Sequence, residues 1–237
     1  NVWEARQVAQ VAKETGVATQ LGNQGHSGEG IRQTCEWIWD GAIGDVREVH
    51  AWTGATRWNK KHSGGIPPAE TVPQGVNWDL WLGPRQTRPY SSIYSPVSWR
   101  DFWDFGTAPI GDFFCHNFDP ACWALDLREP LSIEAHGAGE ADDYMAPVGG
   151  LYTYRFGPRN KMPAVTFTWY DGGLMPPRPE GLEAGDQLGS SLFPWSCVRR
   201  VISPFPGSTR KRSKTLRSSR AVMAILSPFG DHFGVWL

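Results

Sequence analysis

The sequence predicts a helix–strand unit of α/β type, followed by an α+β domain built around a sheet. Apolar residues recur at helical spacing between residues 2 and 15, Gly16 suits the end of that helix, and residues 17–21 are typical of a short strand. A second helix is expected over residues 29–40 and a strand over residues 46–52. Further strands are predicted, from runs rich in β-branched and aromatic residues, at 131–138, 150–156 and 164–171.

The composition is that of an ordinary globular protein. Of the 237 residues, 40% are apolar and 20% are charged, which excludes an intrinsically disordered chain. No apolar run reaches the roughly 18 residues of a membrane-spanning helix, so no membrane partner is expected. The four cysteines form no CxxC pair and no zinc-finger spacing with histidine, so neither a disulfide framework nor a metal site is expected.

The charge is divided unevenly along the chain. Residues 1–189 carry a formal charge of −8, whereas residues 190–237 carry +7 and include a basic cluster at 210–214. Three interpretations of this serine-rich tail are open: a nucleic-acid-binding patch, a solvated extension, or a reading frame shifted near residue 189. The slight aromatic content of the tail argues against nucleic acid as a partner, and the abrupt change of composition favours the shifted frame.

A glycine- and amide-rich loop follows the first predicted strand. Residues 22–27 have the sequence GNQGHS, and ligands of open α/β sheets bind at the carboxyl ends of strands. The alternative is a plain turn in which Ser27 caps the next helix. A second, longer loop is expected over residues 54–77, where glycine and proline are frequent.

An acid and an imidazole stand four residues apart in a third predicted helix, for which Thr107 is a plausible N-cap. At this spacing Asp112 and His116 would share one helix face and come within hydrogen-bond reach. The carboxylate would hold the tautomer of the ring, and the imidazole could then exchange a proton with a substrate hydroxyl. A structural Asp–His pair is the alternative, and so is a metal site that adds Asp119. We interpret Asp119 instead as the N-cap of a new helix that has Pro120 at its first position.

Several motifs resemble the Gfo/Idh/MocA family of NAD(P)-dependent oxidoreductases. They are the NQG of residues 23–25, the GAIG of 41–44, the VHAW of 49–52, and the run at 106–119 with the pattern DxxxHxxD. The segments at 78–84 (WDLWLGP) and 99–103 (WRDFW) resemble one bacterial branch of that family. The resemblance covers about residues 1–189.

The resemblance implies an N-terminal Rossmann domain for the cofactor and a C-terminal α+β domain with a mainly antiparallel sheet for the substrate. It implies that His116 is the catalytic acid/base and that Asp112 shapes the same site. Trp99 and Arg100 would lie near the substrate, which in this family is a sugar, a cyclitol or a related polyol. The cofactor, NAD or NADP, would lie near Asn23, Gln24 and His26.

The sequence departs from the family in two ways. It contains no GxGxxG after a strand and no Glu-Lys-Pro segment, and both would be expected before Asn1. We therefore expect residues 1–27 to be the C-terminal remnant of the Rossmann domain, residues 28–189 to be the catalytic domain, and residues 190–237 to be an atypical tail. This chain alone is expected to be a poor enzyme or none.

Two functions from different classes follow from these observations. The first is an oxidoreductase acting on CH–OH groups, or an NAD-dependent glycosidase of the same family. The second is a non-catalytic carbohydrate-binding or interaction module derived from that fold. The resemblance also implies a homo-oligomer, and it favours the cytoplasm, with export through a twin-arginine signal as the alternative.

Overall fold

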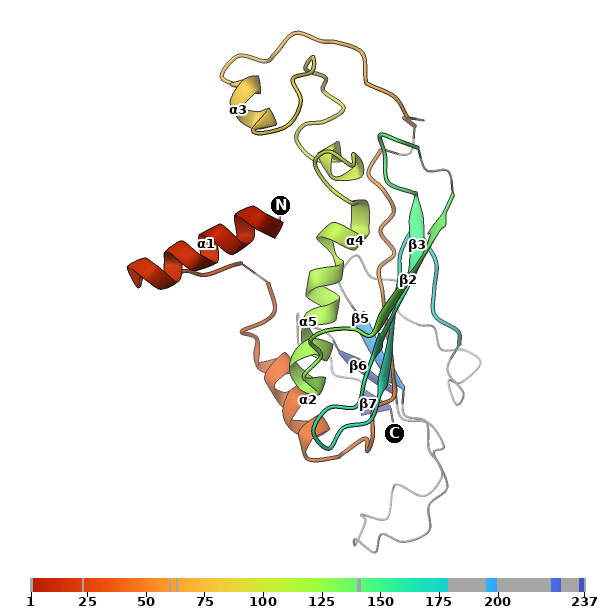
Figure 1. Cartoon of the computed structure of the whole chain (residues 1–237). Helices are drawn as coiled ribbons and strands as arrows, with labels where there is room; N and C mark the ends of the chain where they lie inside the picture. The colour runs from red at the N-terminus through yellow and green to blue at the C-terminus, as the bar shows by residue number, and fades with distance from the viewer. Residues whose placement is uncertain are drawn as a thin grey trace, which may run out of the picture.

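The computed structural model describes residues 2–22, 24–59, 61–62, 64–139 and 142–178, and the backbone of residues 195–199, 223–226 and 235–236. Helix α1 (Val2–Thr15) confirms the first predicted helix, and Gly16 ends it with a φ of 66°. None of the residues of α1 is buried, and the helix projects away from the rest of the molecule (Figure 1). None of the described helices is both long and apolar enough to cross a lipid bilayer.

The predicted strand at residues 17–21 is wrong. These residues have no regular structure and are exposed, with 92% of Leu21 accessible to solvent. A strand needs the N–H and C=O groups of a neighbour, and none of the described strands pairs with this segment. The apolar pattern was therefore not enough to form a strand here.

The sheet lies at the centre of the fold and is mainly antiparallel, as expected. Four strands carry described side chains, in the spatial order β2 (Ser132–Ala138), β3 (Gly149–Phe156), β4 (Val165–Tyr170) and β1 (Glu48–Trp52). Strand β1 runs parallel to β4, and the other pairings are antiparallel. The predicted strands at 46–52, 131–138, 150–156 and 164–171 are thereby confirmed.

The sheet continues past β1 into the tail. The backbone of β5 (Trp195–Arg199) pairs antiparallel with β1 and is followed by β6 (Met223–Leu226) and β7 (Val235–Trp236). These short strands lie beyond residue 189, where the sequence pattern had predicted no further strands. The remainder of the tail, with its basic cluster, lies outside the described residues.

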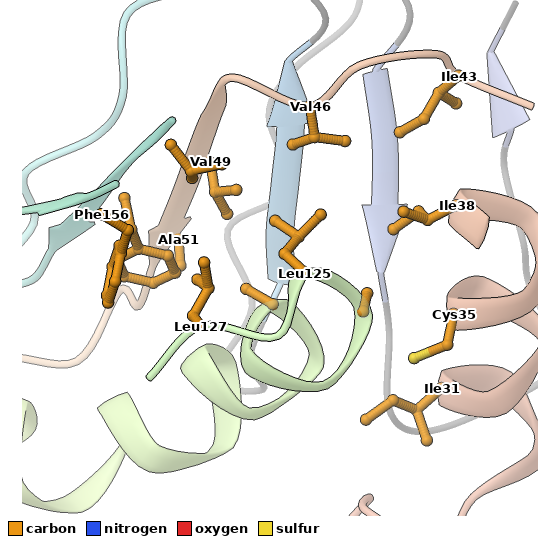
Figure 2. Close-up of a cluster of buried hydrophobic side chains, with 14 of the residues drawn as sticks. Ile31, Cys35, Ile38, Ile43, Val46, Val49, Ala51, Leu125, Leu127 and Phe156 are labelled. Atoms are coloured by element: carbon orange, nitrogen blue, oxygen red, sulfur yellow. The ribbon is translucent and has the colours of Figure 1, made fainter. Parts of the chain in front are cut away.

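Two helices cover one face of the sheet and enclose the main core. Helix α2 (Glu29–Trp39) buries Ile31, Cys35 and Ile38, which recur at helical spacing as predicted. These side chains meet apolar residues of β1 and of the end of α5 (Phe114–Leu125), as Figure 2 shows. Gly28, and not Ser27, is the N-cap residue of α2, and no side chain caps this helix.

A second, smaller core holds the long loop and the short helices in place. The predicted loop at 54–77 is confirmed, and it leads to α3 (Trp78–Leu82), whose N-cap Asn77 accepts a hydrogen bond from the Leu80 N–H. The indoles of Trp78 and Trp81 stack at a centroid distance of 4.6 Å. The fully buried centre of this core consists of Tyr94, Phe102 and Met145.

Candidate functional site

The helix predicted to carry the catalytic pair is divided in two. Helix α4 (Ala108–Asp112) follows Thr107, which occupies the N-cap position as predicted but makes no side-chain capping bond. Helix α5 begins at Phe114, so Phe113 lies in the turn between the two helices. Asp112 therefore ends one helix while His116 lies in the first turn of the next. The rule that residues four apart face one another holds only within a continuous helix.

Asp112 pairs with Arg100 instead of with His116. The Asp112 Oδ2 lies 3.2 Å from the Arg100 Nε, and both side chains are partly exposed. Arg100 belongs to the short 3₁₀ helix η1 (Ser98–Asp101), which packs against α4. Among the described hydrogen bonds and ion pairs, none joins Asp112 to His116, so the expected contact between them is not formed.

The guanidinium of Arg100 is held by aromatic rings as well as by the carboxylate. It lies 4.5 Å from the ring centroid of Trp99 and 5.5 Å from that of Trp58. The Trp58 indole in turn stacks on Phe113, at 6.2 Å and 12°. This arrangement combines hydrogen-bond donors and acceptors with aromatic faces, and such a surface can bind the hydroxyls and the C–H groups of a polyol.

Asp101 holds the backbone of the segment that carries Trp58. Its carboxylate is fully buried and accepts hydrogen bonds from the backbone N–H groups of Trp58 (3.0 Å) and Asn59 (2.6 Å). Burial raises the pKa of Asp101, although these two hydrogen bonds oppose the shift. Gly106 is required nearby, because a Cβ at that position would collide with the Arg100 backbone. The backbone around Arg100 is therefore closely fixed.

His116 is held by a backbone carbonyl from a distant segment. Its Nδ1 lies 3.3 Å from the carbonyl oxygen of Gln24, and the side chain is half-buried. A carbonyl oxygen can only accept a hydrogen bond, so in this contact Nδ1 carries the ring proton. The other ring nitrogen, Nε2, then has a lone pair that can accept a proton from a substrate.

The prediction that Asp119 caps a new helix is wrong. Asp119 and Pro120 both lie inside α5, which has already begun at Phe114. Pro120 lacks the N–H that would bond to the carbonyl of His116, and it is buried within the helix. The Asp119 carboxylate is therefore free of any capping role.

Asp119 instead binds His26. The His26 Nδ1 lies 2.8 Å from Oδ2 and 3.0 Å from Oδ1 of Asp119. The same ring stacks on the Trp123 indole with a centroid distance of 4.7 Å and an interplanar angle of 24°. The loop that the sequence predicted to bind a ligand thus contacts α5 at three positions, His116, Asp119 and Trp123.

The structure brings together most of the predicted site residues, but in pairs that the sequence did not indicate. Gln24 and His26 contact α5, and Arg100 contacts Asp112, while Asn23 lies outside the described residues. The metal alternative gains no support, because Asp112, His116 and Asp119 have separate partners. In the part of the chain that the structure describes, no group of three or more His, Cys, Asp or Glu residues could hold a metal ion.

The thiols near the site are poor nucleophiles. Burial raises the pKa of Cys115, and the Asp112 and Asp119 carboxylates add to the shift. Burial also raises the pKa of Cys35 to about 11 and that of Cys122 to about 12. Since the thiolate is the reactive form, these three cysteines do not supply a nucleophile near neutral pH.

The site therefore consists of an Arg100–Asp112 pair on η1 and α4 and of a His116 imidazole on α5 that contacts a distant backbone carbonyl. Residues 41–157 match the family described as "Oxidoreductase family, C-terminal alpha/beta domain". This segment is therefore similar to the C-terminal domain of the Gfo/Idh/MocA family of oxidoreductases. The matched segment contains Trp99, Arg100, Asp112 and His116. No curated protein matches the chain.

Proposed function

We propose that this chain provides the substrate-binding and proton-transfer part of an enzyme that moves a hydride between NAD or NADP and a CH–OH carbon of a sugar, a cyclitol or a related polyol. One observation carries the proposal: the Nδ1 of His116 is committed to the Gln24 carbonyl, which leaves Nε2 as a proton acceptor. The family supports the reaction class. Oxidation of a carbinol needs such a base, because the O–H proton must leave as the C–H hydride leaves.

The substrate would lie against Arg100 and its neighbours. The guanidinium and the Asp112 carboxylate can share hydrogen bonds with two adjacent hydroxyls of a polyol. The rings of Trp58 and Trp99 can cover its C–H face. In this arrangement Arg100 and Asp112 orient the substrate, and His116 takes or returns the proton.

The residues of this chain do not by themselves fit a whole dinucleotide. The sequence has no GxGxxG loop, and the predicted cofactor residues are engaged elsewhere: the His26 ring by Asp119 and Trp123, and the Gln24 carbonyl by His116. No step is therefore assigned to the cofactor through these residues. We propose that α1 packs on a sheet of Rossmann type, because its exposed Val8 and Val11 are side chains that such packing would bury.

The test is a comparison of turnover in the complete open reading frame that contains these residues. His116→Ala should lower the rate of nicotinamide reduction by polyols about 10²–10⁴-fold if the imidazole is the acid/base. His136→Ala is the matched control, because His136 lies on the exposed strand β2 and pairs with Glu134. Equal rates for wild type and His116→Ala would refute the role.

A non-catalytic carbohydrate-binding module is the second candidate, because the Arg100–Asp112 pair and the indoles of Trp58 and Trp99 could hold a polyol without any reaction. A module of this kind would bind a polyol, and the protein encoded by the complete reading frame would not reduce the nicotinamide. A glycosidase of the same family would give a third outcome, which is cleavage of a glycoside without net reduction of the nicotinamide. The same assay, run with free polyols and with glycosides, separates the three.

A further inference from the structure

We propose that His26 and Asp119 form a positioning pair that keeps the ring proton of His116 on Nδ1. This inference rests on the proposed function, in which the Nε2 of His116 must be free to accept a proton. The pair does not touch the substrate in this proposal. It acts through the backbone carbonyl of Gln24, two residues before His26.

The geometry joins the loop to a single stripe of α5. His116, Asp119 and Trp123 follow the spacing i, i+3, i+7, which places them along one face of the helix. Gln24 contacts the first of these residues, and His26 contacts the second and the third. The loop therefore lies along α5 and is attached at three successive positions.

Among the contacts of the described residues, little else fixes the Gln24 carbonyl. The segment before it, residues 17–22, has no regular structure, and Gly25 after it has a φ of 98°. Within the loop, the Gly28 N–H donates a hydrogen bond to the Gly25 carbonyl at 3.0 Å. At 3.3 Å, the contact of the Gln24 carbonyl with His116 is long for a hydrogen bond. We conclude that the hydrogen bond of His26 to Asp119 and its ring stack on Trp123 hold this carbonyl in reach.

The chemical consequence concerns the tautomer. A neutral imidazole in water favours the proton on Nε2, and in that form Nε2 cannot accept another. An acceptor on Nδ1 reverses this preference, since only the Nδ1–H form can donate to it. Asp112, which the sequence spacing suggested for this task, is engaged with Arg100. The Gln24 carbonyl takes its place, and His26 with Asp119 keeps it there.

The experiment reads the tautomer directly. The full chain is labelled with ¹⁵N-histidine, and long-range ¹H–¹⁵N correlations are recorded at a pH where the rings are neutral. The wild type should show His116 mainly as Nδ1–H. In His26→Ala and in Asp119→Leu, which has no acceptor, Nδ1–H should become the minor form, whereas His26→Gln, which can still donate to Asp119, should restore part of it. His136→Ala is the control and should leave the His116 signals unchanged.

Each outcome decides the question. An unchanged His116 tautomer in His26→Ala and Asp119→Leu, or an Nε2–H form in the wild type, overturns the inference. Asp119→Leu nearly keeps the size of the side chain but removes the acceptor, so it gives the same test if the truncation of His26 disturbs the fold. If the tautomer shifts as expected but His116→Ala leaves turnover unchanged, the positioning pair stands and the proposed function fails. If His116→Ala abolishes turnover but the tautomer does not shift in the His26 and Asp119 variants, the proposed function stands and the positioning pair fails.

Discussion

The sharpest stability prediction concerns Asp171, which is buried at the end of β4. Its side chain is 1% exposed, and its Oδ2 accepts a hydrogen bond from the Trp169 indole at 2.7 Å. Burial raises the pKa of Asp171 from 3.8 to about 6, although this hydrogen bond opposes the shift. Between these two values the folded chain holds a proton that the unfolded chain has lost. Stability from this group is therefore fully present below pH 4 and is lost as the pH rises through about 6.

The magnitude follows from the size of the shift. About two pKa units correspond to about 3 kcal/mol of unfolding free energy lost between pH 4 and pH 7. Asp171→Asn removes the titration but keeps an oxygen that can accept the Trp169 N–H. The free energy of unfolding of the wild type, relative to this variant, should therefore fall by about 3 kcal/mol over that range. The nearby Tyr152 has a pKa raised to about 12 by its own burial first and by Asp171 second, so it does not titrate in this window.

The measurement is a series of urea unfolding curves from pH 4 to pH 7 on the wild type, on Asp171→Asn and on a control. Asp45→Asn is the control, because Asp45 is exposed and pairs only with the nearby Arg47 among its described contacts. The control should follow the wild type in parallel. If the curves of Asp171→Asn also ran parallel to the wild type, the burial argument would be refuted.

Three further predictions test the packing and the site. Gly172→Ala should destabilise the fold by about 2–5 kcal/mol, because its φ is positive and a Cβ would collide with the backbone of β3. Gly173→Ala is the control, with a positive φ but open space around it, and should cost about 1–2 kcal/mol. Urea unfolding compares the two variants, and equal losses of stability would contradict the packing argument. Arg100→Lys should raise the KM for a polyol about tenfold, since an ammonium lacks the flat fork that stacks on tryptophan; an unchanged KM would exclude Arg100 from substrate binding. Asn117→Ala should cost about 1–3 kcal/mol, because the buried amide donates to the Trp52 carbonyl at 2.9 Å, and a stable variant would show that this bond contributes little.

The periodicity of apolar residues was sufficient to predict a helix or a strand where the segment buries one face within the domain. Helix α2 formed where Ile31, Cys35 and Ile38 recur, and the strands β2, β3 and β4 formed within one or two residues of their predicted bounds. The same reasoning failed at residues 17–21, because a strand is defined by its partner and not by its own composition. It also failed at Asp119, where the Asp-Pro pair suggested a helix start inside a helix that was already under way.

The sequence predicted which residues belong to the candidate site, but it did not predict which of them contact one another. Arg100 and Asp112 pair between η1 and α4, and His26 and Gln24 contact α5, yet none of these partners followed from the spacing. The His26–Asp119 and Gln24–His116 contacts join residues 93 and 92 positions apart, and no local rule describes such pairs. A stripe at 116, 119 and 123 was visible in the sequence and could have indicated a surface of α5 that receives another segment.

The break between α4 and α5 explains why the predicted Asp–His pair did not form. Arg100 is charged at every physiological pH, and its partly buried guanidinium, stacked on two indoles, needs a counter-charge. Asp112 supplies that charge from the end of α4, and the turn at Phe113 separates it from His116. His116 is left with a neutral carbonyl, which fixes the tautomer without placing a full negative charge beside the ring. The proton transfer proposed for Nε2 therefore depends on a contact between distant segments and not on the carboxylate four residues earlier in the chain.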